Sequence, residues 1–241
     1  MKKMILKTAL LACVAIAGNA QALPVAGQGT WETTLLGRDI NGNAVAGGDA
    51  SAVFLYDTVL DVTWLRDANA NGLMNWSQAN TWAANLVVGA YDDWRLPTMV
   101  DTPNATLSYT GGTDYGYNVR TTSGSTVYSE MASLWYDTLG NKAVYDVFGN
   151  SPQAGWGLTN TGDFQNLQEF FYWSGLEYEP DGGWYFDTPA GFQGIRDGWR
   201  SMHAMAVRDG NVSPVPEPET YALMLAGLAV VGAAARRRKA K

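Results

Sequence analysis

The sequence predicts a mixed α+β fold, a single domain with two main helices and several short antiparallel strands. Three observations carry this prediction. Apolar side chains recur with the period of a helix in one stretch after residue 75 and in a second after residue 129. The last third of the chain instead holds short aromatic runs separated by Gly, Pro and Asp, as strands and turns do. The 241 residues contain no internal repeat, and both ends differ in composition from the middle.

Residues 1–22 have the composition of a cleavable signal peptide. Three lysines precede an apolar run from 9 to 17, and Ala20-Gln21-Ala22 supplies the small-x-small pattern of a cleavage site. The apolar run is too short to span a bilayer, which needs about 20 apolar residues. We therefore expect an exported protein that is cut after Ala22.

Residues 23–50 are rich in Gly, Asn and Ala, and we expect them to form a flexible N-terminal segment or an edge hairpin. The predicted domain spans residues 51–210. Its first element is a β-hairpin, because apolar side chains alternate with small or polar ones at 53–55 and again at 62–64. The residues between them, 57–61, are the predicted turn.

The first helix is predicted to begin at Trp76, since apolar side chains recur at positions 76, 79, 83 and 86. Asn75 is a suitable N-cap, and Gln78 completes a variant of the capping box. A second helix is predicted over residues 129–139, with a serine as its cap and a glycine directly after it. Both helices present one apolar stripe to the core.

Strands follow in the last third, at 170–173, 184–186 and 202–207. Gly182-Gly183 and Pro189-Ala190-Gly191 are predicted turns between them. Ten tryptophans in a chain without a disulfide indicate a heavily aromatic core.

The predicted domain is strongly acidic. Between residues 23 and 210, eight basic residues stand against 21 acidic ones, a net charge of −13. Such a surface repels phosphate backbones, so nucleic acid is not expected as a partner. Its acidity suits divalent cations or simply keeps an exported protein soluble. The only cysteine, Cys13, lies in the signal peptide, which leaves the exported domain without disulfides or cysteine–zinc sites.

The C-terminal end has three parts. Pro216-Glu217-Pro218 lies in a linker at 211–219, an apolar stretch runs from 221 to 235, and a basic cluster occupies 236–239. Fifteen apolar residues make a helix of about 22 Å, short for a bilayer of roughly 30 Å. The basic cluster belongs on the cytoplasmic side. We therefore expect residues 220–241 to form a transmembrane helix and a basic tail.

This ending resembles the PEP-CTERM sorting signal of Gram-negative bacteria. The resemblance implies processing by an exosortase, a membrane-embedded, transpeptidase-like cysteine protease, in a setting of exopolysaccharide and biofilm production. It also implies an intermediate anchored in the inner membrane, which is then delivered to the cell surface or the extracellular matrix.

Several segments resemble, in the correct order, the Lcl C-terminal domain family. These segments are 59–69, 72–76, 91–98, 156–161, 172–178, 184–187 and 204–209. The resemblance implies a single C-type-lectin-like domain, similar also to the formylglycine-generating enzymes. The cysteines of those enzymes are missing, so their activity does not carry over. The lectin tripeptides Glu-Pro-Asn and Gln-Pro-Asp are missing too, and the nearest match, Glu179-Pro180-Asp181, is expected to be a turn. Arg95 is expected to pin a loop.

A possible metal site lies just before the first helix. Oxygen-bearing side chains alternate and are followed by Gly72, as in the first half of an EF-hand-like calcium loop. The candidate calcium ligands are Asp67, Asn69, Asn71 and Asn75. The twelfth position, usually a bidentate Glu, is Gln78. The missing Glu favours the alternative, an Asn- and Gly-rich turn that leads into the helix.

No catalytic residue is assigned, and no cofactor is expected beyond possible calcium. His203 is the only histidine, and no Ser-His-Asp order accompanies it. A carboxylate pair for glycoside hydrolysis stays open as an alternative, because 21 acids allow many pairings. Four aromatic side chains near turns are candidates for stacking on sugars, although core packing is the favoured role. They are Tyr178, Trp184, Tyr185 and Trp199.

We therefore expect an exported, exosortase-sorted surface or matrix protein. Its lectin-like module is expected to bind extracellular polysaccharide or a cell-surface component and not to catalyse a reaction. The alternatives are a glycan-active hydrolase that remodels the biofilm matrix and a purely structural surface protein.

Overall fold

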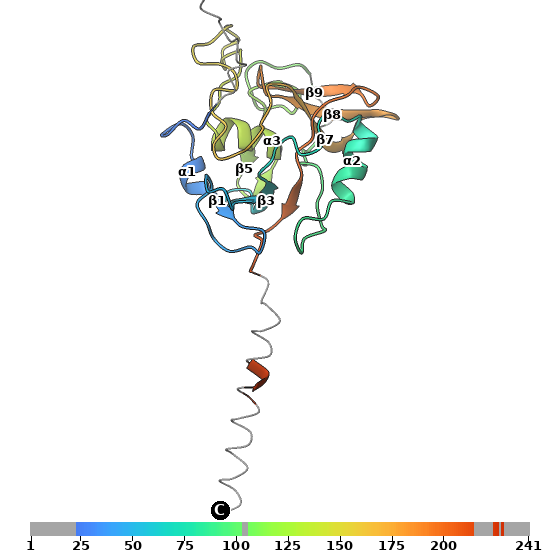
Figure 1. The fold of residues 1–241 in the computed structure, drawn as a ribbon. Helices are drawn as coiled ribbons and strands as arrows, with labels where there is room; N and C mark the ends of the chain where they lie inside the picture. Colours follow the sequence, from blue (N-terminus) through green and yellow to red (C-terminus); the bar gives the residue numbers. More distant parts are fainter. Residues whose placement is uncertain (1–22, 103–105, 215–223, 227, 229–241) are drawn as a thin grey trace, which may run out of the picture.

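The computed structural model describes residues 23–102, 106–214, 224–226 and 228. The predicted signal peptide lies outside these residues, as do the Pro216-Glu217-Pro218 motif and most of the expected transmembrane helix. Within the described residues, no helix combines the length and the apolar character needed to cross a membrane. The described residues between 23 and 214 form the folded body (Figure 1).

Two four-stranded antiparallel sheets organise this body. The first has the strand order β1-β2-β3-β10, the second has the order β4-β9-β8-β7, and β5 pairs with β6 alone. The strands of the first sheet are β1 (Leu35–Arg38), β2 (Phe54–Asp57), β3 (Val62–Leu65) and β10 (Val207–Asp209). The others are β4 (Gly116–Tyr117), β5 (Thr122–Ser123), β6 (Thr126–Val127), β7 (Phe171–Glu177), β8 (Gly182–Asp187) and β9 (Phe192–Asp197). The predicted mixed architecture is confirmed, while the lectin-like fold stays a prediction.

The predicted hairpin at the start of the domain is the pair β2–β3. Its turn is closed by Asp57, whose carboxylate accepts hydrogen bonds from the backbone N–H groups of Val59 and Leu60. The preceding segment, 23–50, contributes the short helix α1 (Trp31–Thr34) and the strand β1. Because β1 stands at one end of the order β1-β2-β3-β10, it is the edge strand of the first sheet. The folded body therefore includes residues before position 51.

The first predicted helix is α2 (Trp76–Ala84). Its capping box is formed as expected: Asn75 Oδ1 accepts from Gln78 N at 2.8 Å, and Asn75 N donates to Gln78 Oε1 at 3.1 Å. The buried face presents Ala79 and Ala83 to the second sheet, and Figure 1 shows α2 beside β7. Small side chains on this face let the helix lie close to the strands.

The second predicted helix divides into α3 (Glu130–Ala132) and the π-helix η1 (Ser133–Thr138). The Ser129 hydroxyl accepts from Ala132 N, so the predicted cap is confirmed. Leu139 N bonds to Leu134 O, five residues back, which is the π-helical pattern. The wider turn was not predicted, because an apolar stripe does not separate α from π geometry over so few residues.

Large aromatic side chains fill the core, as the composition predicted. Trp64, Trp135, Trp173 and Trp184 are all at most 1% exposed. Trp135 packs on Phe186 of β8 with ring centroids 5.6 Å apart. This contact brings η1 against the second sheet.

Two of the predicted elements are wrong. Gly182 and Gly183 do not form a turn but begin β8. A Cβ built on Gly183 would come within 2.3 Å of Trp76 Cδ1, so the glycine serves a close approach. The predicted strand 202–207 is mostly irregular: Met202 and His203 form isolated bridges, and β10 begins only at Val207.

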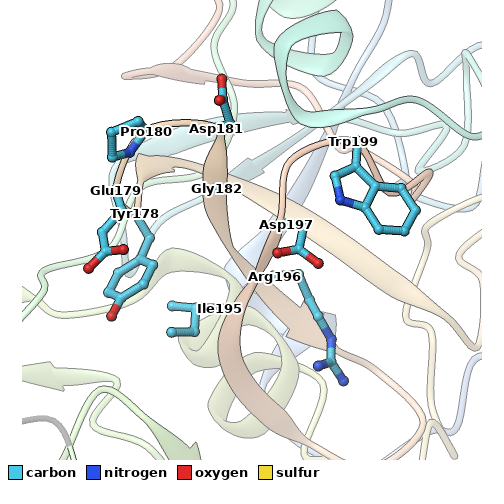
Figure 2. Close-up of a pocket in the computed structure, with 9 residues that line it drawn as sticks. All are labelled: Tyr178, Glu179, Pro180, Asp181, Gly182, Ile195, Arg196, Asp197 and Trp199. Atoms are coloured by element: carbon cyan, nitrogen blue, oxygen red, sulfur yellow. The ribbon is translucent and has the colours of Figure 1, made fainter.

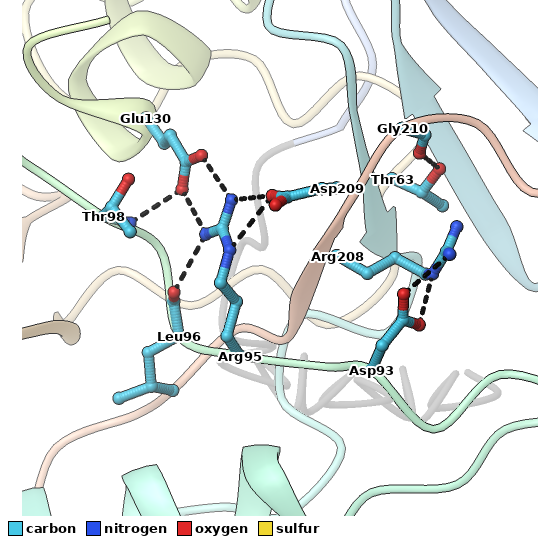
Figure 3. A network of polar contacts seen from close by, with 9 residues as sticks. All are labelled: Thr63, Asp93, Arg95, Leu96, Thr98, Glu130, Arg208, Asp209 and Gly210. Atoms are coloured by element: carbon cyan, nitrogen blue, oxygen red, sulfur yellow. Dashed lines mark hydrogen bonds and ion pairs between the residues drawn. The ribbon is translucent and has the colours of Figure 1, made fainter.

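Arg95 pins a loop, as predicted (Figure 3). Its guanidinium donates to both carboxylate oxygens of Glu130 and also contacts Asp209. Glu130 in turn accepts from Thr98 N at 2.7 Å, and the Arg95 backbone pairs with Val207 of β10. One ion-pair network thus joins the 94–98 segment, α3 and the first sheet.

Candidate functional site

Trp199 is the most exposed tryptophan of the described residues. It is 69% exposed, in the loop after β9. The other aromatic candidates behave differently: Trp184 and Tyr185 are at most 3% exposed, and Tyr178 is half-buried with its ring against Trp184. Core packing was therefore the right role for Trp184 and Tyr185 and the wrong one for Trp199.

The backbone that carries Trp199 is held from two sides. Gly198 N donates to Asp181 O in the β7–β8 turn, and Gly198 O accepts from Trp76 N at the start of α2. A Cβ on Gly198 would lie 2.5 Å from Asp181 O, so only glycine fits between these two anchors. The indole therefore projects from a rigid loop, and a ligand that stacks on it would not have to order the loop first.

Trp199 lies at the meeting point of three hollows. The first, of about 300 Å³, runs along the β7–β8 turn and β9; Figure 2 shows Trp199 and the turn residues Glu179 and Pro180 at opposite sides of it. The second, of about 540 Å³, lies toward Phe170 and Phe171. The third, of about 470 Å³, lies toward the N-terminus of α2. Ligand sites have volumes of this order, roughly 300–1,000 Å³.

The Glu179-Pro180-Asp181 turn forms one wall of the first hollow. It is the predicted turn: Tyr178 N donates to Gly182 O at 3.0 Å, and Gly182 N donates to Glu179 O at 3.3 Å. Glu179 and Asp181 have positive φ values of 54° and 70°, a conformation that costs a residue with a Cβ about 1–2 kcal/mol. Strained backbone conformations of this kind are concentrated at functional sites, where they fix the orientation of the side chains.

Two further groups shape the surface around the indole. The Arg200 guanidinium lies 4.8 Å from the centroid of the Trp199 ring, a cation–π contact. The Arg196 guanidinium lies 5.6 Å from the centroid of the Tyr185 ring. Both arginines are therefore oriented by aromatic rings and remain exposed at the hollows.

The predicted calcium loop is a network of local hydrogen bonds. Asp67 Oδ1 accepts from Asn69 N and from Asn166 Nδ2, both at 3.0 Å. Asn71 Nδ2 lies 2.9 Å from Met74 Sδ. The described residues contain no group of three or more His, Cys, Asp or Glu that could hold a metal ion. This geometry resembles an Asx turn, and the calcium site stays a prediction.

The fourth predicted ligand, Asn75, has a separate role. Its Oδ1 accepts the backbone N–H of Gln78 as the helix cap, and that hydrogen bond holds the oxygen at the N-terminus of α2. The structure therefore gives Asn75 a partner that does not require calcium, and it places Asn75 beside the third hollow instead.

His203 lies on the irregular segment before β10, next to β7. Its ring packs against Phe170 and Tyr172, with centroids 5.6 Å and 5.5 Å away. Burial lowers its pKa, so the imidazole is neutral at pH 7. These contacts give His203 a packing role.

The sequence did not predict that the three hollows around Trp199 form one site. Their lining comes from residues 75–77, 170–171, 177–182 and 195–202, which are far apart in the sequence. One local signal was present. Asp197-Gly198-Trp199-Arg200 places a tryptophan among polar residues and glycine, where a core residue is not expected.

Residues 214–239 match the family model of the PEP-CTERM protein-sorting motif. The predicted sorting signal, with Pro216, Glu217 and Pro218, is confirmed, and it marks a protein that is exported, processed by an exosortase and sorted to the cell surface. No curated protein and no solved structure matches the chain. The resemblance of the folded body to the Lcl C-terminal domain family stays a prediction.

Proposed function

We propose that this exosortase-sorted protein acts at the cell surface as a non-enzymatic module that binds extracellular polysaccharide through the groove around Trp199. The three hollows that meet at this residue together form the Trp199 groove. The single observation that carries the proposal is the exposed, rigidly held indole of Trp199 among charged and polar side chains.

The chemistry of sugars suits such a site. An indole offers a flat apolar face to the C–H groups of a sugar ring, and nearby polar groups fix the orientation of its hydroxyls. Burial of apolar surface contributes roughly 25 cal/mol per Å², so an exposed Trp199 forgoes folding stability that a buried one would provide. The resemblance to lectin-like domains and the sorting signal support the same function.

The hydrolase alternative rests on the carboxylates of Glu177 and Asp181, which line the hollow next to Trp199. A hydrolase would use two such groups as acid and as base or nucleophile. In that case the protein would shorten the polysaccharide that it binds, and Asp181→Asn would stop the cleavage while leaving binding intact. A purely structural protein would bind no polysaccharide at all.

The test is binding of the folded body to exopolysaccharide purified from the producing bacterium, measured by pull-down and calorimetry. We expect binding by the wild type and its loss in Trp199→Ala, with an unchanged melting temperature because the indole is exposed. Trp156→Ala is the matched control, since Trp156 is 45% exposed and does not line the Trp199 groove. Equal binding by the wild type and Trp199→Ala would contradict the proposal, and release of reducing ends would favour the hydrolase.

A further inference from the structure

Two of the three hollows that meet at Trp199 carry opposite charge. The one toward Phe170 and Phe171 is lined by two bases, Arg196 and Arg200, and by no acid. The one toward α2 is lined by two acids, Glu177 and Asp181, and by no base. Both contain Trp199, so a ligand that crosses the indole passes from a cationic hollow into an anionic one.

The two arginines have donors that the protein does not use. Among the described residues, the five other arginines each donate a side-chain hydrogen bond to the protein. They are Arg38, Arg66, Arg95, Arg120 and Arg208. Arg200 approaches an acid only loosely, with its Nε 3.9 Å from Asp197 Oδ2. A guanidinium presents its donors as a planar fork that fits a carboxylate, and here two such forks face one hollow.

The two acids of the other hollow also lack hydrogen-bond partners within the described part of the chain. Glu177 and Asp181 are exposed, and neither carboxylate accepts a hydrogen bond from the described part of the chain. Asp181 is held at φ 70° by the turn, and its backbone oxygen anchors the Trp199 loop through Gly198. This hollow also presents the polar side chains of Asn75 and Ser77. An ammonium group or a set of hydroxyls would satisfy these acceptors.

We propose that the Trp199 groove selects a polysaccharide in which a carboxylate-bearing sugar adjoins an amino-bearing sugar. The uronate unit occupies the cationic hollow at Arg196 and Arg200, and the amino sugar occupies the anionic hollow at Glu177 and Asp181. This inference rests on the proposed function and specifies the class of its ligand. A polymer with acidic units alone would be repelled by the body, whose net charge is −13 between residues 23 and 210.

The experiment compares four oligosaccharides by calorimetry at low salt. They are oligogalacturonate, a chitosan oligosaccharide, a neutral cello-oligosaccharide and an N-deacetylated heparosan oligosaccharide, in which glucuronate alternates with glucosamine. We expect the alternating oligosaccharide to bind at least tenfold more tightly than each of the other three. Raising the salt concentration should reduce this preference, because exposed charges are screened.

Two double variants test which hollow binds the uronate unit and which binds the amino sugar. Arg196→Gln/Arg200→Gln should weaken binding of the alternating oligosaccharide about tenfold and leave the chitosan oligosaccharide unaffected or bound more tightly, because the variant is more acidic. Glu177→Gln/Asp181→Asn should weaken the alternating and chitosan oligosaccharides and leave oligogalacturonate unaffected or bound more tightly. Asn tolerates the positive φ of position 181, so this variant keeps the turn.

The outcomes separate this inference from the proposed function. If the native exopolysaccharide binds through Trp199 but both double variants keep full affinity for it, the charge selection is wrong and the binding function stands. If neither the native polysaccharide nor any oligosaccharide binds, both fail. Binding of a cell-surface protein at Trp199 without binding of any glycan would also overturn the inference.

Discussion

Arg95 and Glu130 face each other as a two-pronged ion pair, with Nη1 and Nη2 each 2.8 Å from a carboxylate oxygen. Glu130 is 5% exposed and is also bonded by Thr98 N. The pair therefore closes the contact between the segment at 94–98 and α3 inside the protein. We therefore expect removal of this ion pair to lower the free energy of unfolding.

Glu130→Gln should lower the free energy of unfolding by about 3 kcal/mol, because the guanidinium of Arg95 would lose its buried counter-charge. Urea unfolding of both proteins measures the difference. Asp209→Asn is the control: Asp209 also contacts Arg95, but its side chain is 82% exposed, so the loss should be about 1 kcal/mol or less. Equal losses in the two variants would show that burial does not govern this network.

Gly183→Ala should destabilise the protein by about 1–3 kcal/mol, because the added methyl group would overlap Trp76 and overpack the contact between β8 and α2. The Trp76 indole cannot move freely, since its Nε1 donates to Ser174 O at 2.9 Å. Gly175→Ala in β7 is the matched control. Its nearest contact, Leu96 Cβ, would be at an ordinary 3.4 Å. A well-folded Gly183→Ala protein with unchanged melting would contradict the close approach seen here.

Asp187, at the end of β8, should make stability depend on pH. Burial raises its pKa from 3.8 to about 6, although Ala190 N donates to the carboxylate. Between these two pH values the folded state binds more protons than the unfolded state, so stability falls as the pH rises. The penalty is absent below about pH 4 and complete above about pH 6.

Asp187→Asn removes this penalty. We expect its melting temperature to exceed that of the wild type at pH 7.5, with the difference shrinking toward zero at pH 4. Thermal unfolding of the two proteins across this range measures it. The comparison cancels the contribution of Asp57, whose pKa burial also raises. A difference that stays constant with pH would rule out titration of Asp187 as its cause.

Calcium in the 67–75 loop is tested by thermal unfolding with calcium and with EDTA. If the predicted site binds calcium, EDTA lowers the melting temperature and Asp67→Ala abolishes the difference. Asn75→Ala separates a ligand from a cap: loss of the cap should cost about 1 kcal/mol with and without calcium alike. Identical melting curves of the wild type in calcium and in EDTA would show that the 67–75 loop does not bind calcium.

Features that depend on near neighbours in the chain could be predicted. The capping box of Asn75 and Gln78, the Ser129 cap and the turn at 179–181 each form from residues a few positions apart. The sorting signal at 214–239 is likewise a linear motif. The failed predictions involve residues distant in the chain: Gly182-Gly183 has the composition of a turn, yet it begins β8, and Gly183 there leaves room for the Trp76 side chain.

The sequence by itself determined where this protein goes and where its main helices begin, because a sorting signal and a helix cap are both specified locally. The tertiary structure alone decided which tryptophans are buried and which, like Trp199, remain exposed. Trp184 and Trp199 are the same residue type, and each directly follows a glycine in the sequence. Trp184 is covered by the packed sheet, whereas Trp199 projects from a loop anchored at Asp181 and Trp76. The opposite charges beside Trp199 likewise arise only from folding, since burial and juxtaposition depend on residues distant in the chain.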